Sequence, residues 1–71
     1  MKNKHEIKNN LLKYRVVKEL KQRELAQELK ISLNHLRVIE KEYIYPKYQV
    51  RAKICKFFNV NQDQMFYIET D

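Results

Sequence analysis

Two short apolar stripes stand close together between Leu20 and Glu40, and they constrain the fold more than any other feature of the chain. Each stripe has the spacing of one helical face, and the predicted helices span about residues 22–30 and 33–41. Isolated helices of about eight residues are marginal in water, so each must be held by the other and by a surrounding core. The stripe residues are Leu25, Ala26 and Leu29 in the first helix and Leu36 and Ile39 in the second.

The short connection between the stripes fixes the angle between the two helices. Ser32 can act as the N-cap of the second helix, because its hydroxyl can accept from a free backbone N–H of the first turn. Ile31, just before it, can pack back as a hydrophobic staple. The small side chain of Ala26 permits close approach where the helices cross. This is the geometry of a helix-turn-helix, whose second helix is displayed on the surface and offered to the major groove of DNA.

The composition narrows the fold class. A chain of 71 residues makes one domain, and this one contains no Gly and a single Pro. Hairpin turns that need positive φ normally draw on Gly, so the chain is predicted to be compact and all-α. Asn is expected to replace Gly wherever a helix ends in the left-handed conformation. A core this small is marginal, which favours a partner subunit.

Three further helices are expected around the two short ones. The first spans about residues 6–18. The fourth opens within residues 46–47, where proline stops the preceding segment, and it ends at Asn59. A short fifth helix begins at Asn61, which forms a capping-box-like pair with Gln64. The residues expected to face inward are Ile7, Leu11, Tyr14 and either Val16 or Val17 in the first helix, and Val50, Ile54, Phe57 and Phe58 in the fourth.

Positive charge flanks the two short helices on both sides. The formal net charge is +6. Residues 1–18 hold six Lys or Arg against one Glu and residues 43–60 hold four Lys or Arg, whereas residues 19–42 are balanced and residues 61–71 hold three acidic residues. A polyanion suits this pattern, because each neutralised phosphate releases condensed counterions. A solvated surface explains basic charge alone equally well, and the flanking arrangement is what favours nucleic acid.

Several function classes find no support in the residues. Cys55 stands alone, so there is no disulfide framework and a reducing cytoplasm is the expected location. No segment has the apolar run of a signal peptide or a membrane span. Cys55, His5 and His35 share no zinc-type spacing, and His35 is interpreted as a polar surface residue rather than a metal ligand. We find no nucleophile with a base, no paired-carboxylate cleft and no glycine loop, and therefore expect neither an enzyme nor a cofactor.

The assembled residues resemble those of the Cro/CI-type helix-turn-helix family of phage and plasmid repressors, also called XRE-type regulators. The resemblance covers about residues 11–66 and rests on joint spacing rather than on any single residue. It implies a lambda-repressor-like DNA-binding domain of five helices. We place this domain at residues 6–67, with a basic arm at residues 1–5 and a tail at residues 68–71. The matching residues are Arg15, Leu20, Gln22, Glu24, Leu25, Ala26, Leu29, Ile31, Ser32, Leu36, Ile39, Glu40, Pro46, Lys53, Ile54, Asn59, Val60, Asp63 and Phe66.

The resemblance also implies which residues read DNA. The positions at which such proteins contact base edges are occupied here by Leu33, Asn34, Arg37 and Val38. Helical spacing agrees independently, because the inward stripe leaves these four positions toward the exposed face. Asn34 can pair with adenine through two hydrogen bonds, and Arg37 can pair with guanine or clamp a phosphate. Leu33 and Val38 offer only methyl groups, which suit thymine methyls, so part of the recognition is expected to be apolar.

Phosphate contacts are expected around the same helix. The resemblance implies that Gln22 hydrogen-bonds a phosphate and braces the side chain at the start of the third helix. It also implies an ion pair of Arg15 with Glu40 beneath that helix, which we assign to structure. The expected phosphate contacts are Gln22, Arg23, Ser32, Lys41, Tyr43 and Lys47. Tyr48, by contrast, is expected to pack on the core.

Four positions depart from the family pattern. Lys21 stands where a Ser or Thr N-cap is usual, and Lys30 and Glu42 stand where Gly is usual. A non-Gly residue in the left-handed conformation costs about 1 kcal/mol, so the turn at Lys30 is either built differently or strained. Arg51 replaces a usual apolar residue and adds charge to the fourth helix, where it faces either the phosphate backbone or a dimer seam.

Two functions remain open at this point, and the basic flanks favour the first. It is a sequence-specific regulator of double-stranded DNA, a repressor acting as a homodimer on a near-palindromic operator, with no small-molecule effector. Its recognition helices would enter successive major grooves about 34 Å apart. The second is a protein-interaction module on the same fold, with an antitoxin-like or anti-repressor role. Leftover apolar residues at the end of a small domain need cover, and the expected dimer interface is Phe57, Met65, Tyr67 and Ile68.

Overall fold

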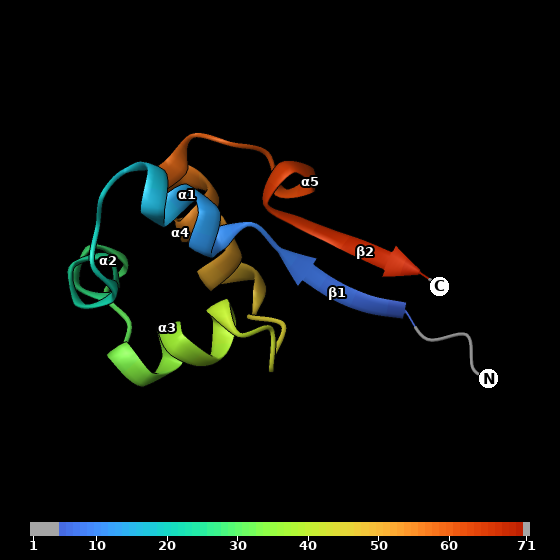
Figure 1. Ribbon diagram of the computed structural model, residues 1–71, viewed down its shortest axis with the longest axis horizontal. Helices are drawn as coiled ribbons and strands as arrows, with labels where there is room; N and C mark the ends of the chain where they lie inside the picture. Colours follow the sequence, from blue (N-terminus) through green and yellow to red (C-terminus); the bar gives the residue numbers. More distant parts are fainter. Residues whose placement is uncertain (1–4, 71) are drawn as a thin grey trace.

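The computed structural model describes residues 5–70, in which five helices form one body and two strands extend together from one side (Figure 1). The elements are β1 (His5–Asn9), α1 (Leu11–Val17), α2 (Gln22–Leu29), α3 (Leu33–Glu40), α4 (Tyr48–Phe58), α5 (Gln62–Met65) and β2 (Phe66–Thr70). The mostly helical fold is confirmed. The all-α class is wrong in one respect, because the two ends of the described chain pair as an antiparallel sheet.

The sheet replaces the first part of the predicted first helix. Ile7 in β1 pairs with Ile68 in β2, and the strand residues around Ile68 are aromatic and β-branched types that suit a pleated surface. Asn9 then ends the strand, because its Oδ1 accepts from Leu11 N–H at 3.0 Å and its Nδ2 donates to Ile39 O at 2.9 Å. The helix therefore begins at Leu11, and the predicted start near Glu6 is wrong.

The predicted arm and tail both contribute to this sheet. His5, the last residue of the arm, opens β1, and residues 68–70 of the tail belong to β2. Residues 1–4 of the arm and Asp71 of the tail lie outside the described residues. The two segments that the sequence placed at opposite ends of the chain thus lie side by side (Figure 1).

The core lies between the helices and confirms both predicted stripes. Its buried residues are Leu11, Leu25, Ala26, Leu29, Leu36, Ile39, Ile54, Cys55, Phe58, Met65 and Phe66. Tyr14, Ile31, Val50 and Phe57 are partly buried and pack against this cluster. This single small core includes residues from all five helices. It therefore supplies the packing that the short helices α2 and α3 need to be stable.

The predicted inward residues at the ends of the first helix are wrong. Val16 and Val17 are exposed, because the side chain of Arg15 takes the inward side of α1 and leaves positions 16 and 17 outside the buried face. Ile7 is also exposed, since it lies in β1. Tyr48 was expected in the core but is 64% exposed.

Among residues 5–70, four residues at or near helix ends have positive φ, and three of them are Lys or Glu, which rarely adopt it. Asn59 ends α4 in the left-handed conformation, as predicted, with φ of 56°. Lys30 and Glu42, the two positions where the family has Gly, have φ of 59° and 65°, and Glu19 has φ of 59°. The expectation that Asn would serve at every such end is therefore wrong. The turn at Lys30 keeps the backbone path that Gly usually supplies and bears the steric cost.

Relieving that cost should stabilise the protein. We expect Lys30→Gly to raise the free energy of unfolding by about 0.5–1 kcal/mol, because the gain in the left-handed region exceeds the added entropy of the unfolded chain. Urea denaturation measures the change. Glu42→Gly is the contrasting variant, since its carboxylate accepts from Asn9 N–H at 2.8 Å and pairs with Lys8 at 3.4 Å, and losing these contacts offsets the gain. Equal destabilisation by both variants would contradict the assignment of strain to Lys30.

Candidate nucleic-acid interface

The turn between α2 and α3 sets the direction of α3. Lys30 ends α2, and its N–H returns to the carbonyl oxygens of Ala26 and Gln27. Ser32 Oγ accepts from His35 N–H at 3.0 Å, which confirms the predicted N-cap. Ile31 is partly buried against the core. With a left-handed stop on one side and a cap on the other, α3 starts at a fixed angle to α2.

The four predicted base-reading positions lie on the side of α3 that faces away from the core. Asn34 and Arg37 are exposed, whereas Leu33 and Val38 are half-buried with part of their methyl surface accessible. The opposite side of α3 is fully buried through Leu36 and Ile39. In Figure 1, α3 runs along one margin of the helical body. His35, predicted at the surface, is half-buried.

A chain of polar contacts connects the interior with Arg37 on this surface. Arg15 donates from Nε and Nη2 to the carboxylate of Glu40, with Nη2 at 3.2 Å from Oε1, and from Nη1 to Leu20 O at 2.8 Å. The side chains of Arg15 and Glu40 are only 13% and 4% exposed. Gln22 Nε2 donates to Glu40 Oε1 at 2.9 Å, and its Oε1 lies 3.4 Å from Arg37 Nε.

The resemblance implied that Gln22 braces the start of α3, but the contacts of Gln22 lie elsewhere on that helix. Its partners are Arg37 and Glu40, which lie in the second half of that helix. Gln22 thus contacts the exposed Arg37 and is itself held by Glu40 of the buried ion pair. The resemblance implied the ion pair of Arg15 with Glu40 but not the contacts of Gln22 with Glu40 and Arg37, because these depend on how α2 crosses α3.

We call the six predicted phosphate-contacting residues the rim. Arg23, Ser32, Lys41, Tyr43 and Lys47 of the rim are exposed, and Gln22 is half-buried. Lys41 Nζ lies 5.8 Å from the centre of the Tyr43 ring, which brings an ammonium and a phenol together after the end of α3. Cations and hydroxyls are side-chain groups that commonly contact phosphate oxygens.

Glu42 connects the end of α3 with the sheet, a role that its place in the sequence did not reveal. Its Oε2 accepts from Asn9 N–H at 2.8 Å, and its Oε1 lies 3.4 Å from Lys8 Nζ. In the sequence, the position stands out only as a departure from Gly. No local signal could have shown the contact, since residues 8 and 9 were predicted to be helical and lie at the other end of the chain.

The predicted dimer interface does not form one surface. Met65 is fully buried in the core, so its assignment to an interface is wrong. Phe57 is half-buried and lines a depression with Leu29 and Lys53, whereas Ile68 lines a different pocket. The exposed remainder is Ile68, at 63%, together with Tyr67.

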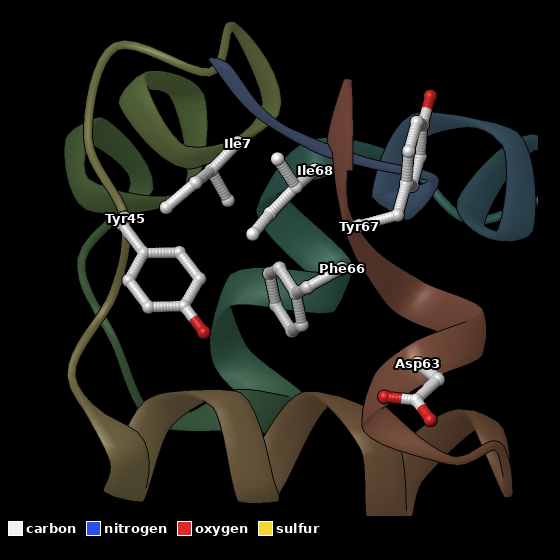
Figure 2. Close-up of a pocket in the computed structure, with 6 residues that line it drawn as sticks. All are labelled: Ile7, Tyr45, Asp63, Phe66, Tyr67 and Ile68. Atoms are coloured by element: carbon white, nitrogen blue, oxygen red, sulfur yellow. The ribbon is translucent and has the colours of Figure 1, made fainter. Parts of the chain in front are cut away.

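The pocket beside Ile68 lies against the sheet and has a volume of about 410 Å³ (Figure 2). Ile7 and Ile68, which are register partners, point toward Tyr45 and Phe66, and Tyr67 points away from them. Five of its six lining residues are aliphatic or aromatic and come from the loop before α4 and from both strands, and the sixth is Asp63 of α5. The exposed members of the predicted interface therefore lie on β2, beside Ile7 of β1, and not on α4 or α5.

No group of three or more His, Cys, Asp or Glu side chains among residues 5–70 could hold a metal ion. Burial raises the pKa of the Cys55 thiol, and the nearby charge of Arg51 lowers it by less, so the thiol is protonated at neutral pH. None of the helices described has the length and apolar content needed to cross a membrane.

Comparison with known proteins agrees with the geometry of α2 and α3. The family model described as a helix-turn-helix domain matches residues 9–67, which is most of the chain. The protein belongs to the XRE-type helix-turn-helix family. An uncharacterized HTH-type transcriptional regulator of Methanocaldococcus jannaschii is 37% identical over 65 residues, which cover 92% of this chain and 98% of the relative. The match to this relative thus spans nearly the whole of both proteins.

Proposed function

We propose that the protein is a sequence-specific regulator of transcription that binds double-stranded DNA, and that it acts as a repressor. The observation that carries the proposal is the exposure of Asn34 and Arg37 on α3, directly above a buried network that orients Arg37. A purely solvent-facing role for α3 does not explain why Gln22 contacts Arg37 and is itself held by the buried pair of Arg15 with Glu40. The name of the archaeal relative supports a regulatory role.

Base recognition follows from the chemistry of the exposed side of α3. The amide of Asn34 can accept and donate at once, which matches the N6 and N7 edge of adenine. The guanidinium of Arg37 matches the O6 and N7 edge of guanine, and its Nε contact with Gln22 leaves the terminal N–H groups available. Leu33 and Val38 place methyl groups where a thymine methyl can pack.

The rim residues supply affinity and register rather than sequence discrimination. Gln22, Arg23, Ser32, Lys41, Tyr43 and Lys47 are the proposed phosphate contacts. Lys or Arg contacts to phosphate release counterions, so the binding constant should fall steeply as salt increases. The basic residues on both sides of the helix-turn-helix contribute to the same attraction.

We further propose a homodimer on a near-palindromic operator. The supporting observation is the exposed apolar surface of the sheet, formed by Ile7 and Ile68 around the pocket and by Tyr67 beside it. An isolated two-stranded sheet is marginal in water, and a second copy would cover it. A dimer bound over an operator would repress by occupying the site that the transcription machinery needs.

Selection of bound sites from a pool of random duplexes tests the function. We expect an enriched motif with two half-sites about 10 base pairs apart, and binding that weakens by orders of magnitude between about 50 and 200 mM salt. A single half-site would contradict the homodimer but not DNA binding. Failure to bind any duplex at low salt, or binding that is indifferent to salt, would instead favour the protein-interaction module.

A further inference from the structure

Arg51 is the residue of α4 that departs from the family pattern, and its side chain contacts several neighbouring segments of the chain. The guanidinium carbon lies 4.4 Å from the centre of the Tyr45 ring and 5.6 Å from that of Tyr48. Nη1 donates to Pro46 O at 2.7 Å, and Nε donates to Gln62 Oε1 at 3.2 Å. One half-buried side chain thus contacts the loop before α4, the first turn of α4 and the start of α5.

The loop side of this arrangement is anchored further into the core. The ring of Tyr45 meets the ring of Phe66 edge-on, with centres 5.9 Å apart. Phe66 is buried, and so is Pro46. Figure 2 shows Tyr45 and Phe66 facing each other across the pocket. The middle of the loop is therefore fixed from two directions, by Phe66 on one side and by Arg51 on the other.

The same loop carries three of the proposed phosphate contacts. Tyr43 and Lys47 flank the anchored residues Tyr45 and Pro46, and Lys41 stands just after α3. Their side chains are exposed, while the backbone between them is held by Arg51. A loop that is already ordered in the free protein loses less conformational entropy when it binds the phosphates than a mobile loop does.

We propose that Arg51 is a positioning residue for this loop, residues 41–47, and strengthens DNA binding by ordering it rather than by contacting a phosphate. The proposal rests on the proposed DNA-binding function. Arginine suits the role because its planar guanidinium can stack on a ring and donate in several fixed directions at once. Lysine keeps the charge but lacks the planar group with several fixed donors. The Arg51→Lys variant therefore separates the effect of loop positioning on DNA binding from the effect of charge.

The test is a double-mutant cycle of Arg51→Lys with Lys47→Gln, measured by titration of a 20-base-pair duplex of mixed sequence at low salt. Such a duplex suffices, because phosphate contacts supply nearly all non-specific binding. We expect Arg51→Lys to weaken binding about tenfold although the net charge is unchanged. We also expect Lys47→Gln to cost much less in the Arg51→Lys background than in the wild type, because a loose loop no longer presents residue 47 to the phosphate.

A second readout separates positioning from general stability. In the free protein, ¹⁵N relaxation should show increased fast motion of the amides in residues 42–47 of the Arg51→Lys variant, with little change in α3. Tyr45→Leu is the second variant, and it should weaken binding without adding to the effect of Arg51→Lys. Lys56→Gln, at the far end of α4, is the control that removes a charge without touching the loop.

Three outcomes overturn the proposal. Wild-type affinity in Arg51→Lys would show that charge alone matters, and additive effects with Lys47→Gln would show that Arg51 acts independently of the loop. Unchanged relaxation in residues 42–47 would show that the loop is ordered without Arg51. If the wild type binds no duplex, the proposed function itself fails, whereas the other three results contradict only the role of Arg51.

Discussion

Replacing Glu40 with Ala is expected to lower the free energy of unfolding by about 3 kcal/mol, because it leaves a nearly buried guanidinium without its carboxylate. Arg15, whose side chain is only 13% exposed beside Glu40, would lose its charge partner, and Gln22 would lose the oxygen to which it donates. A domain of this length has a total stability of only about 4–10 kcal/mol, so the variant should be close to unfolding at physiological temperature. Thermal and urea denaturation measure the loss.

Two controls distinguish an unpaired buried charge from the loss of any glutamate. Glu28→Ala removes an exposed carboxylate from α2 and should change stability by no more than about 0.5 kcal/mol. The double variant Arg15→Met with Glu40→Leu removes both charges and should recover most of the stability, because a buried ion pair is about as stable as a well-packed apolar pair. A Glu40→Ala protein that melts like Glu28→Ala would contradict the structural role of the pair.

Replacing Arg37 or Asn34 with Ala is expected to change which DNA sequences the protein prefers. Each substitution should remove about 1–3 kcal/mol of discrimination at one base pair of each half-site, which corresponds to a factor of about 5–150. Affinity for duplexes that already lack the preferred base should change far less. Binding curves for a set of single-base operator variants measure the effect.

The matched control is a substitution on the rim. Lys41→Ala should weaken binding to every duplex by a similar factor and lower the salt dependence, because a phosphate contact carries no sequence information. Gln22→Ala should resemble Arg37→Ala in part, since Gln22 holds the arginine in place. If Arg37→Ala and Asn34→Ala reduced affinity equally for all sequences, α3 would not be the base-reading helix.

The parts of the site that the sequence predicted are those governed by short-range rules. The apolar stripes of α2 and α3, the Ser32 cap and the left-handed end at Asn59 each depend on residues within a few positions of one another. The family resemblance added the pairing of Arg15 with Glu40, which spacing alone would not have given. These features together fix the helix-turn-helix and the side of α3 that faces outward.

The parts that the sequence did not predict depend on contacts between distant segments. The segment around Ile7 has a helical spacing toward Leu11, and only the availability of β2 as a partner makes it a strand. Met65 was assigned to an interface because no local sequence signal shows that the core extends to α5. Arg51 looked like surface charge, because its contact with Tyr45 depends on the loop before α4 and on the packing of Tyr45 against Phe66 of β2.

By itself, the sequence determined that this chain makes a small helical domain with a displayed second helix, because helical periodicity and capping are local properties of the backbone. Only the tertiary structure decided that the ends of the chain pair as a sheet, that Gln22 orients Arg37, and that Arg51 holds the loop before α4. Those features require segments far apart in the chain to meet at a particular angle. That angle is set by the packing of the whole core, which no single stretch of sequence contains.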